Sequence, residues 1–187
     1  KSLREKIPSN ILIIEDCAES FGSRRNDIHS GFYSDFATFS FFGNKTITTG
    51  EGGMLFCKKI QDRKRARVLR DHGMNKEKRY WHDEVGFNFR LTNMQAAVGV
   101  AQLERASYIL SSKQRIFEKY YELLSNHGFI FNSSSDNSIF NSQWLVLVSH
   151  PLILKKGVDE LERQMKLIGI DVRKVFYPLS CMTIYKD

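Results

Sequence analysis

The sequence predicts an α/β protein, and three observations carry the prediction. Residues 11–14 form a continuous apolar run rich in isoleucine, which is typical of a strand buried on both faces of a parallel sheet. Two more strand patterns follow at 36–41 and 53–57, and helical patterns fill most of the chain after them. The 187 residues suffice for one domain, or for one large piece with a smaller one attached.

Composition and charge narrow the class of protein. Apolar residues make up 42% and charged residues 26%, as expected for a soluble globular chain that buries a real core. The net charge of +7 favours anionic partners such as phosphates, nucleotides or nucleic acid without choosing among them. No apolar run reaches the length of a membrane span, and no signal-peptide core opens the chain. The three cysteines are too few and too far apart for a disulfide framework or a zinc site, so we expect a cytoplasmic location.

The first strand ends in two acidic residues. Glu15 and Asp16 come directly after the apolar run, and open α/β sheets bind their ligands at the carboxyl ends of strands. The strands at 36–41 and 53–57 are joined by a loop with four glycines between positions 43 and 53. So many glycines predict a loop whose backbone conformation matters, rather than a helix.

The second half of the chain is mostly helical in pattern. Thr92 and Gln95 have the spacing of a capping box at the start of a helix. We place a domain boundary near residue 105, which gives a larger part, 1–105, and a smaller part, 106–187. The other elements we expect are helices at 61–70, 112–125 and 158–168, a loop at 132–142, and strands at 143–148 and 172–176.

Lys45 is the residue best suited to covalent chemistry. It follows an aromatic run inside the glycine-rich loop, and an amine that loses solvation there becomes the nucleophile that a Schiff base needs. On local composition alone, an exposed loop lysine is the commoner outcome. Asp16 either holds a protonated ring nitrogen or is an ordinary strand-end carboxylate, and Ser40, Thr48 and Thr49 can donate to a phosphate.

Other motifs are weaker. Asn88, between Phe87 and Phe89, is either a donor to an anion or a turn asparagine. The segment 58–70 holds seven Lys or Arg residues, but it lacks aromatic residues for base stacking, so a solvated helix face is favoured over a nucleic-acid site. His72 and His82 have no metal-ligand spacing, and we expect no metal site.

Three long motifs resemble one family when they are taken together. The segments 14–20, 40–53 and 86–97, the last followed by Ala101-Gln102-Leu103, resemble in order the signatures of the DegT/DnrJ/EryC1/StrS family of nucleotide-sugar aminotransferases, which depend on pyridoxal 5′-phosphate (PLP). The resemblance covers nearly the whole chain. It implies the PLP-dependent transferase fold type I, as in aspartate aminotransferase: part of a large α/β domain, then a small, incomplete α+β C-terminal domain.

The resemblance also implies roles for single residues. Lys45 would carry the cofactor as a Schiff base and move the proton between cofactor and substrate carbons. Asp16 would pair with the pyridine nitrogen, Glu19 would face the ring hydroxyl, and Ser40 would bind the phosphate. Asn88 would reach the phosphate of the partner subunit's cofactor, which implies a homodimer with shared active sites.

The substrate expectation comes from finer similarities. Glu19, where many members have glutamine or histidine, the segment 43–54 and the segment 79–83 most resemble perosamine synthetases. These aminate GDP-4-keto-6-deoxymannose with L-glutamate as the amino donor, and other nucleotide-linked 4-keto-6-deoxy sugars stay open. His82 and Arg90 are candidate substrate contacts, although a loop histidine and a turn-anchoring arginine are the structural alternatives.

Two parts of the family pattern have no counterpart. Family members have a long N-terminal region that supplies phosphate donors and a residue stacked on the cofactor ring, and the C-terminal tail is cut short after Tyr185. We therefore expect a fragment or a degraded gene product, with weak PLP retention and no independent turnover. The alternatives are a non-catalytic remnant that dimerises or binds nucleotide sugar, and a sugar 3-dehydratase. Such dehydratases replace the lysine with histidine, so Lys45 argues against the second.

Overall fold

The computed structural model describes residues 2–133 and 136–185. The chain forms two compact units, one of Lys1–Tyr120 with Ser133–Val146 and one of Tyr121–Asn132 with Leu147–Asp187. A short helix, α1 (Ser2–Lys6), opens the first unit. The domain boundary expected near residue 105 stays a prediction.

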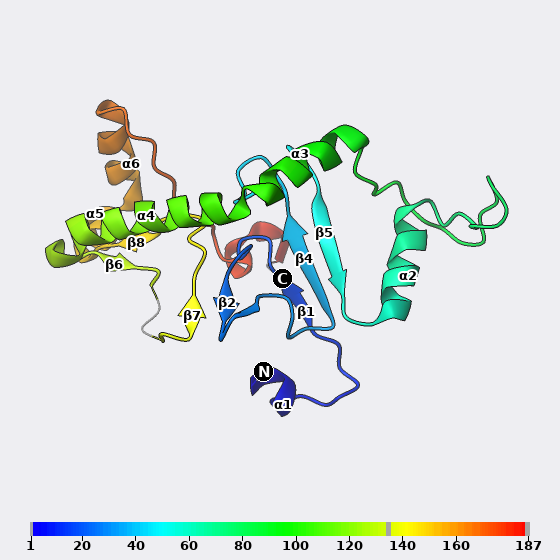
Figure 1. The fold of residues 1–187 in the computed structure, drawn as a ribbon. Coiled ribbons are helices and arrows are strands. Elements are labelled where there is room, and N and C mark those ends of the chain that lie inside the picture. The colour runs from blue at the N-terminus through cyan, green and yellow to red at the C-terminus, as the bar shows by residue number, and fades with distance from the viewer. Residues whose placement is uncertain (1, 134–135, 186–187) are drawn as a thin grey trace. The chain divides into compact units, whose positions relative to one another are not determined.

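The first unit is built on a three-stranded sheet of order β1-β4-β5 (Figure 1). Its strands are β1 (Ile14–Asp16), β4 (Phe36–Ser40) and β5 (Gly53–Cys57). Parallel pairing sets Asp16 of β1 opposite Thr38 of β4, and antiparallel pairing sets Ser40 of β4 opposite Gly53 of β5. The strand predictions for 36–41 and 53–57 are confirmed, as is a parallel pair.

The first strand differs from its prediction. It begins at Ile14 rather than Ile11, and the side chains of Ile11, Leu12 and Ile14 are exposed instead of buried on both faces. The backbone at Ile13 is held by Asp35 at the start of β4: the Ile13 N–H donates to Asp35 Oδ2 at 2.9 Å, and the Asp35 N–H donates to the Ile13 carbonyl at 2.9 Å. Ladder pairing therefore starts only after this turn-like junction.

The Asp35 junction predicts a loss of stability in acid. The Ile13 N–H bond, and after it the nearby charge of Arg4, hold the pKa of the Asp35 carboxyl below its usual value of 3.8. A depressed folded-state pKa stabilises the fold above the unfolded pKa, and the contribution is lost as the pH falls through the folded pKa. We expect the melting temperature to drop below about pH 4, and to drop less in Asp35→Asn. Thermal melts between pH 6 and pH 3 test this, and equal acid slopes in both chains would contradict it.

A second small sheet joins two distant segments of the first unit. It has the order β3-β2-β7, with β2 (Arg24–Arg25), β3 (Ile28–His29) and β7 (Ile139–Phe140) all antiparallel to their neighbours. The loop expected over 132–142 is therefore interrupted by a strand. This pairing brings the chain after Phe140 back toward the loop between β4 and β5, which carries Lys45.

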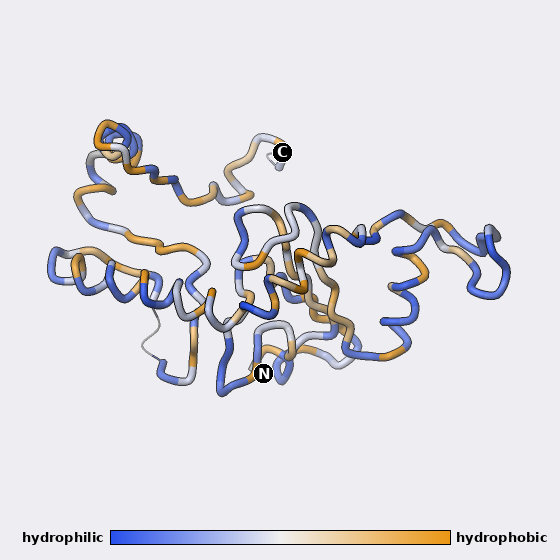
Figure 2. The backbone as a smooth tube through the Cα atoms, turned by 45° about the horizontal axis from the view of Figure 1, so that its top comes forward, coloured by the Kyte–Doolittle hydropathy of each residue, from blue (hydrophilic) through white to orange (hydrophobic). Residues whose placement is uncertain are grey.

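Three helices follow the predicted periodicity, and the last of them continues past Tyr120, where the first unit ends. They are α2 (Ile60–Arg70), α3 (Asn93–Glu104) and α4 (Ala106–Leu124). The capping box is present, since Thr92 Oγ1 accepts from the Gln95 N–H at 3.2 Å and Gln95 Oε1 accepts from the Thr92 N–H at 2.9 Å. α4 begins six residues earlier than the predicted 112. No residue of α2 is buried, and Figure 2 colours most of this helix hydrophilic, in line with the solvated basic face.

The second unit is small. β6 (Ile130–Phe131) pairs with β8 (Val148–Ser149) in antiparallel fashion, and the helices α5 (Pro151–Lys156) and α6 (Val158–Leu167) follow. The helix expected at 158–168 is confirmed. The strand expected at 143–148 is wrong except for its last residue, and the described segment 172–176 has no strand. Three short 3₁₀ helices are also described: η1 (Ser125–His127) before β6, and η2 (Leu179–Cys181) and η3 (Thr183–Tyr185) after α6.

The buried core gathers around the loop between β4 and β5. Phe41 and Ile47 come from this loop, Cys17 follows β1, and Ala37 lies in β4. Among the described residues, no helix is long and apolar enough to cross a membrane, and no group of histidine, cysteine and acidic residues could hold a metal ion. Much of the buried core in the described part of the chain thus supports the Lys45 loop.

Candidate functional site

The glycine-rich loop is closed by backbone hydrogen bonds. The Phe41 N–H donates to the Gly52 carbonyl and the Thr49 N–H donates to the Phe41 carbonyl, both at 2.9 Å. Glycine is required where the loop enters β5, because a Cβ on Gly53 would lie 2.6 Å from the Phe39 carbonyl oxygen in β4. Ile47 is 2% exposed at the base of the loop. The loop is therefore a compact, packed support.

This loop holds the Lys45 amine beside Glu19. The Lys45 side chain is only 14% exposed, and its Nζ atom lies 3.3 Å from Glu19 Oε1. The Lys45 N–H donates to the Phe42 carbonyl at 3.0 Å, which fixes the backbone under the side chain. Two residues predicted to serve one site thus make an ion pair.

Asp16 and Ser40 lie at the same edge of the sheet. They end β1 and β4, which run parallel, so that their carboxyl ends meet. Asp16 Oδ1 accepts hydrogen bonds from the Ala18 N–H at 3.1 Å and the Thr38 hydroxyl at 3.3 Å. Glu19 follows Asp16 by three residues and links this edge to Lys45. The sheet thus gathers an amine, two carboxylates and a hydroxyl.

Asn88, His82 and Arg90 lie in a different place. They belong to the segment between α2 and α3, which extends beyond α2 in Figure 1. Arg90 pairs with Asp71 at 3.2 Å, and the Arg90 Nε–H donates to Asn88 Oδ1 at 3.5 Å. His82 Nδ1 lies 2.8 Å from the His72 carbonyl oxygen. Among the described contacts, all of theirs stay within this segment and none reaches the Lys45 site.

Sequence reasoning missed two residues at the site. Lys45 Nζ lies 4.1 Å from the ring centroid of Trp144, which the sequence placed in an ordinary strand. The Lys113 ammonium donates to the Trp144 carbonyl at 3.0 Å, and burial lowers the pKa of Lys113. Only the tryptophan itself, a large ring where a polar stretch gives way to the apolar run 145–148, was a signal in the sequence.

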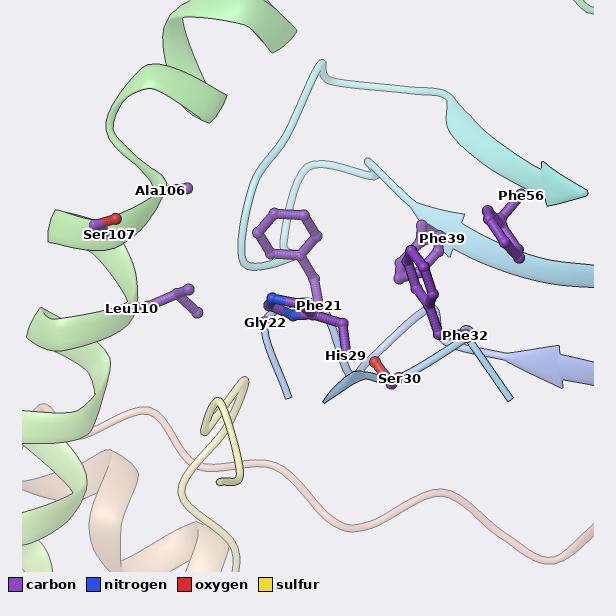
Figure 3. Close-up of a pocket in the computed structure, with 11 residues that line it drawn as sticks. Phe21, Gly22, His29, Ser30, Phe32, Phe39, Phe56, Ala106, Ser107 and Leu110 are labelled. Atoms are coloured by element: carbon purple, nitrogen blue, oxygen red, sulfur yellow. The ribbon is translucent and has the colours of Figure 1, made fainter. Parts of the chain in front are cut away.

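Two buried thiols and an apolar cavity complete the features of the first unit that could react or bind. Burial is the main cause that raises the pKa of the Cys17 and Cys57 thiols, so both stay protonated and poorly nucleophilic at neutral pH. A cavity of about 320 Å³ lies between α4 and the aromatic side chains of the first unit, with the rings of Phe21, Phe32 and Phe39 around it (Figure 3). Its lining is mostly apolar, with His29, Ser30 and Ser107 as the polar members.

Solved structures identify the fold class of the protein. The structure of the aminotransferase TlmJ from Streptoalloteichus hindustanus superposes with a TM-score of 0.88 at 22% identity, covering 100% of this chain and 50% of that one. PseC of Helicobacter pylori, an aminotransferase, also gives 0.88 at 22% identity, over 98% of this chain and 50% of its own. The expected fold, that of the PLP-dependent sugar aminotransferases, is confirmed.

The family follows from sequence. The family model described as "DegT/DnrJ/EryC1/StrS aminotransferase family" matches residues 7–187, and the chain belongs to this family. GDP-perosamine synthase of Escherichia coli O157:H7 is 38% identical over 181 residues, 95% of this chain and 48% of the relative. The protein of the same name from Vibrio cholerae is 38% identical over 187 residues, 100% of this chain and 51% of the relative. The chain thus spans about half the length of these curated relatives.

Proposed function

We propose that the chain is part of a PLP-dependent aminotransferase that moves the amino group of L-glutamate to a nucleotide-linked 4-keto-6-deoxy sugar. GDP-4-keto-6-deoxymannose is the favoured acceptor, because GDP-perosamine synthases are about 38% identical to the chain over nearly its whole length. The observation that carries the proposal is the Lys45 amine, held 3.3 Å from Glu19 on the loop after β4.

The donor set of the edge fits PLP. Asp16 receives its described hydrogen bonds on Oδ1, so Oδ2 is available to accept from a protonated ring nitrogen. Ser40 Oγ accepts from the Phe42 N–H at 3.3 Å, and its own hydrogen is left for a phosphate oxygen. Lys45 supplies the amine, and Glu19 would face the ring hydroxyl. When bound, PLP supplies an electron sink for reactions at the amino-bearing carbon.

Each residue then has one task in the proposed reaction. Lys45 Nζ would take and return the proton that moves between the cofactor carbon and the substrate carbon, since its ion pair with Glu19 holds this amine beside the edge. The Glu19 carboxylate pairs with the Lys45 amine while that amine carries the proton. The carboxylate of Asp16 keeps the ring nitrogen protonated by pairing with its positive charge. The closed loop keeps the Lys45 amine in a fixed position relative to Asp16 and Glu19.

The proposal includes a homodimer with shared sites and a cytoplasmic location. Asn88 makes its described contacts only within the segment 71–90, which is consistent with service to the partner subunit's cofactor. His82 and Arg90 of the same segment would contact the substrate. The three free cysteines support the reducing compartment.

An absorption spectrum of the chain with added PLP tests the function. We expect a band that requires Lys45, is lost in Lys45→Ala and bleaches when L-glutamate is added. Lys113→Met is the sharpest comparison, because burial lowers the pKa of Lys113 and makes it the rival amine.

The band should persist in Lys113→Met. A band that survives in Lys45→Ala but disappears in Lys113→Met would contradict the assignment of the reactive lysine. A Lys45-dependent band that L-glutamate leaves unchanged would contradict the amino donor. A panel of nucleotide-linked keto sugars, added after the bleaching, then tests the acceptor.

A further inference from the structure

We propose that Trp144 is a positioning residue for Lys45: its indole ring, together with Glu19, holds the Lys45 amine in place at the sheet edge whenever that amine is free. The proposal deepens the proposed function, on which its catalytic meaning rests. The contact itself is a property of the chain without any cofactor and can be tested alone.

The amine is held from two directions. Its Nζ atom lies 4.1 Å from the centroid of the Trp144 ring and 3.3 Å from Glu19 Oε1. The face of an indole ring attracts a cation, and tryptophan does so more strongly than other aromatic residues. Both contacts attract a positively charged amine. Together they fix its position as well, because the 14% exposed Lys45 side chain has little room to swing away.

The ring is itself held in place. Its Nε1–H donates to the carbonyl of Asn44, the residue before Lys45, at 2.8 Å. On the other side of the residue, the Trp144 carbonyl accepts from Lys113 at 3.0 Å. Trp144 is 9% exposed. The indole therefore bonds to the backbone of the lysine loop and binds the lysine side chain at the same time, across 100 residues of sequence.

The backbone before Trp144 is held in a conformation that directs the indole ring toward Lys45. The Ser142 N–H donates to Ser23 Oγ at 3.0 Å, and the two hydroxyls lie 2.9 Å apart. Gln143 has φ of +53°, a left-handed conformation that a residue with a side chain seldom adopts. A locally unfavourable backbone persists only where its surroundings demand it, and such residues gather at functional sites. Here the conformation turns the chain out of β7 and places Trp144 against Lys45.

In the proposed reaction, these contacts would keep the Lys45 amine near the reacting atoms. An amine that moves protons must stay near the reacting atoms during the steps in which it is free. The ring and Glu19 keep the charged amine at the edge, so that it returns to the same place in each cycle. Trp144 acts through Lys45 and need not touch the substrate.

Competitive lysine labelling tests the contact directly. The cofactor-free chain is treated with limiting acetic anhydride, and mass spectrometry measures the Lys45 to Lys78 labelling ratio. Lys78 lies 3.6 Å from the exposed Trp81 ring and serves as the internal reference. We expect Trp144→Met, which fills space without a ring, to raise the ratio about fivefold, and Trp144→Phe, which keeps a ring, to stay within about twofold.

The outcomes separate this proposal from the proposed function, because neither PLP nor sugar is present. A ratio in Trp144→Met equal to that of the unchanged chain would overturn the proposal, as would equal rises in the Met and Phe variants. Circular dichroism checks that both variants fold.

A second measurement leaves Trp144 in place. In a Trp81→Phe background, all tryptophan emission comes from Trp144. We expect Lys45→Met to change this emission and Lys78→Met to leave it as it was. Identical spectra for the two lysine variants would show that the amine does not lie on the ring, and the proposal would fail.

Discussion

An Asp16→Asn substitution is expected to slow the bleaching of the PLP-loaded chain by L-glutamate by about a hundredfold or more. The carboxylate at the end of β1 would pair with a protonated ring nitrogen, and a neutral amide cannot stabilise that positive charge. Removal of one fixed electrostatic partner in an active site commonly costs a factor of about 100 to 1,000 in rate. Stopped-flow absorbance at saturating PLP measures the bleaching rate.

The substitution should leave the fold intact. Asparagine keeps an oxygen that can accept the bonds from the Ala18 N–H and the Thr38 hydroxyl, at 3.1 and 3.3 Å in the present structure. Asp27→Asn is the matched control, because Asp27 has an exposed side chain and a left-handed φ of +61° that asparagine tolerates. Equal bleaching rates in the two variants would remove Asp16 from the proposed mechanism.

The half of the site around Lys45 follows from local rules. Parallel pairing of β1 with β4 brings the ends of both strands to one edge, so Asp16 and Ser40 meet without any information from distant segments. Glu19 is three residues beyond Asp16, and the glycine-rich loop returns Lys45 to it at 3.3 Å. A strand pattern, a loop pattern and the geometry that parallel strands share in α/β proteins suffice for this much.

The Trp144 contact does not follow from such rules. A run of apolar residues at 143–148 predicts a strand, but the structure gives only β8 at its end. The competing interactions are specific and distant: Ser142 bonds to Ser23, and the Trp144 ring bonds to the Asn44 carbonyl. Periodicity in a short window contains no information about partners about 100 residues away.

The prediction that the first strand is buried on both faces was wrong for a related reason. A continuous apolar run reports that a strand prefers to be covered on both faces, but not which segment covers it. In the described part of the chain, Ile11 and Ile14 keep their side chains exposed. The apolar pattern therefore predicted where the strands lie and how they pair better than it predicted what packs against the faces of the sheet.

An Ile47→Ala substitution is expected to lower the free energy of unfolding by about 3 kcal/mol, because truncation of a buried isoleucine leaves a cavity and loses apolar contact. Ile47 is 2% exposed at the base of the lysine loop, two residues after Lys45. The cost should fall on the loop first, so the variant should also label faster at Lys45 with acetic anhydride than the unchanged chain. Urea unfolding measures the change in stability.

Ile60→Ala provides the control with the same chemical change. Ile60 is 60% exposed at the start of α2, where alanine is a good helix former, so we expect a change within about 0.5 kcal/mol. Nearly equal unfolding midpoints in the two variants would show that the loop is not packed as described. A large loss in Ile47→Ala alone ties the placement of the Lys45 amine to the buried base of its own loop, and so joins the stability of this fold to the chemistry proposed for it.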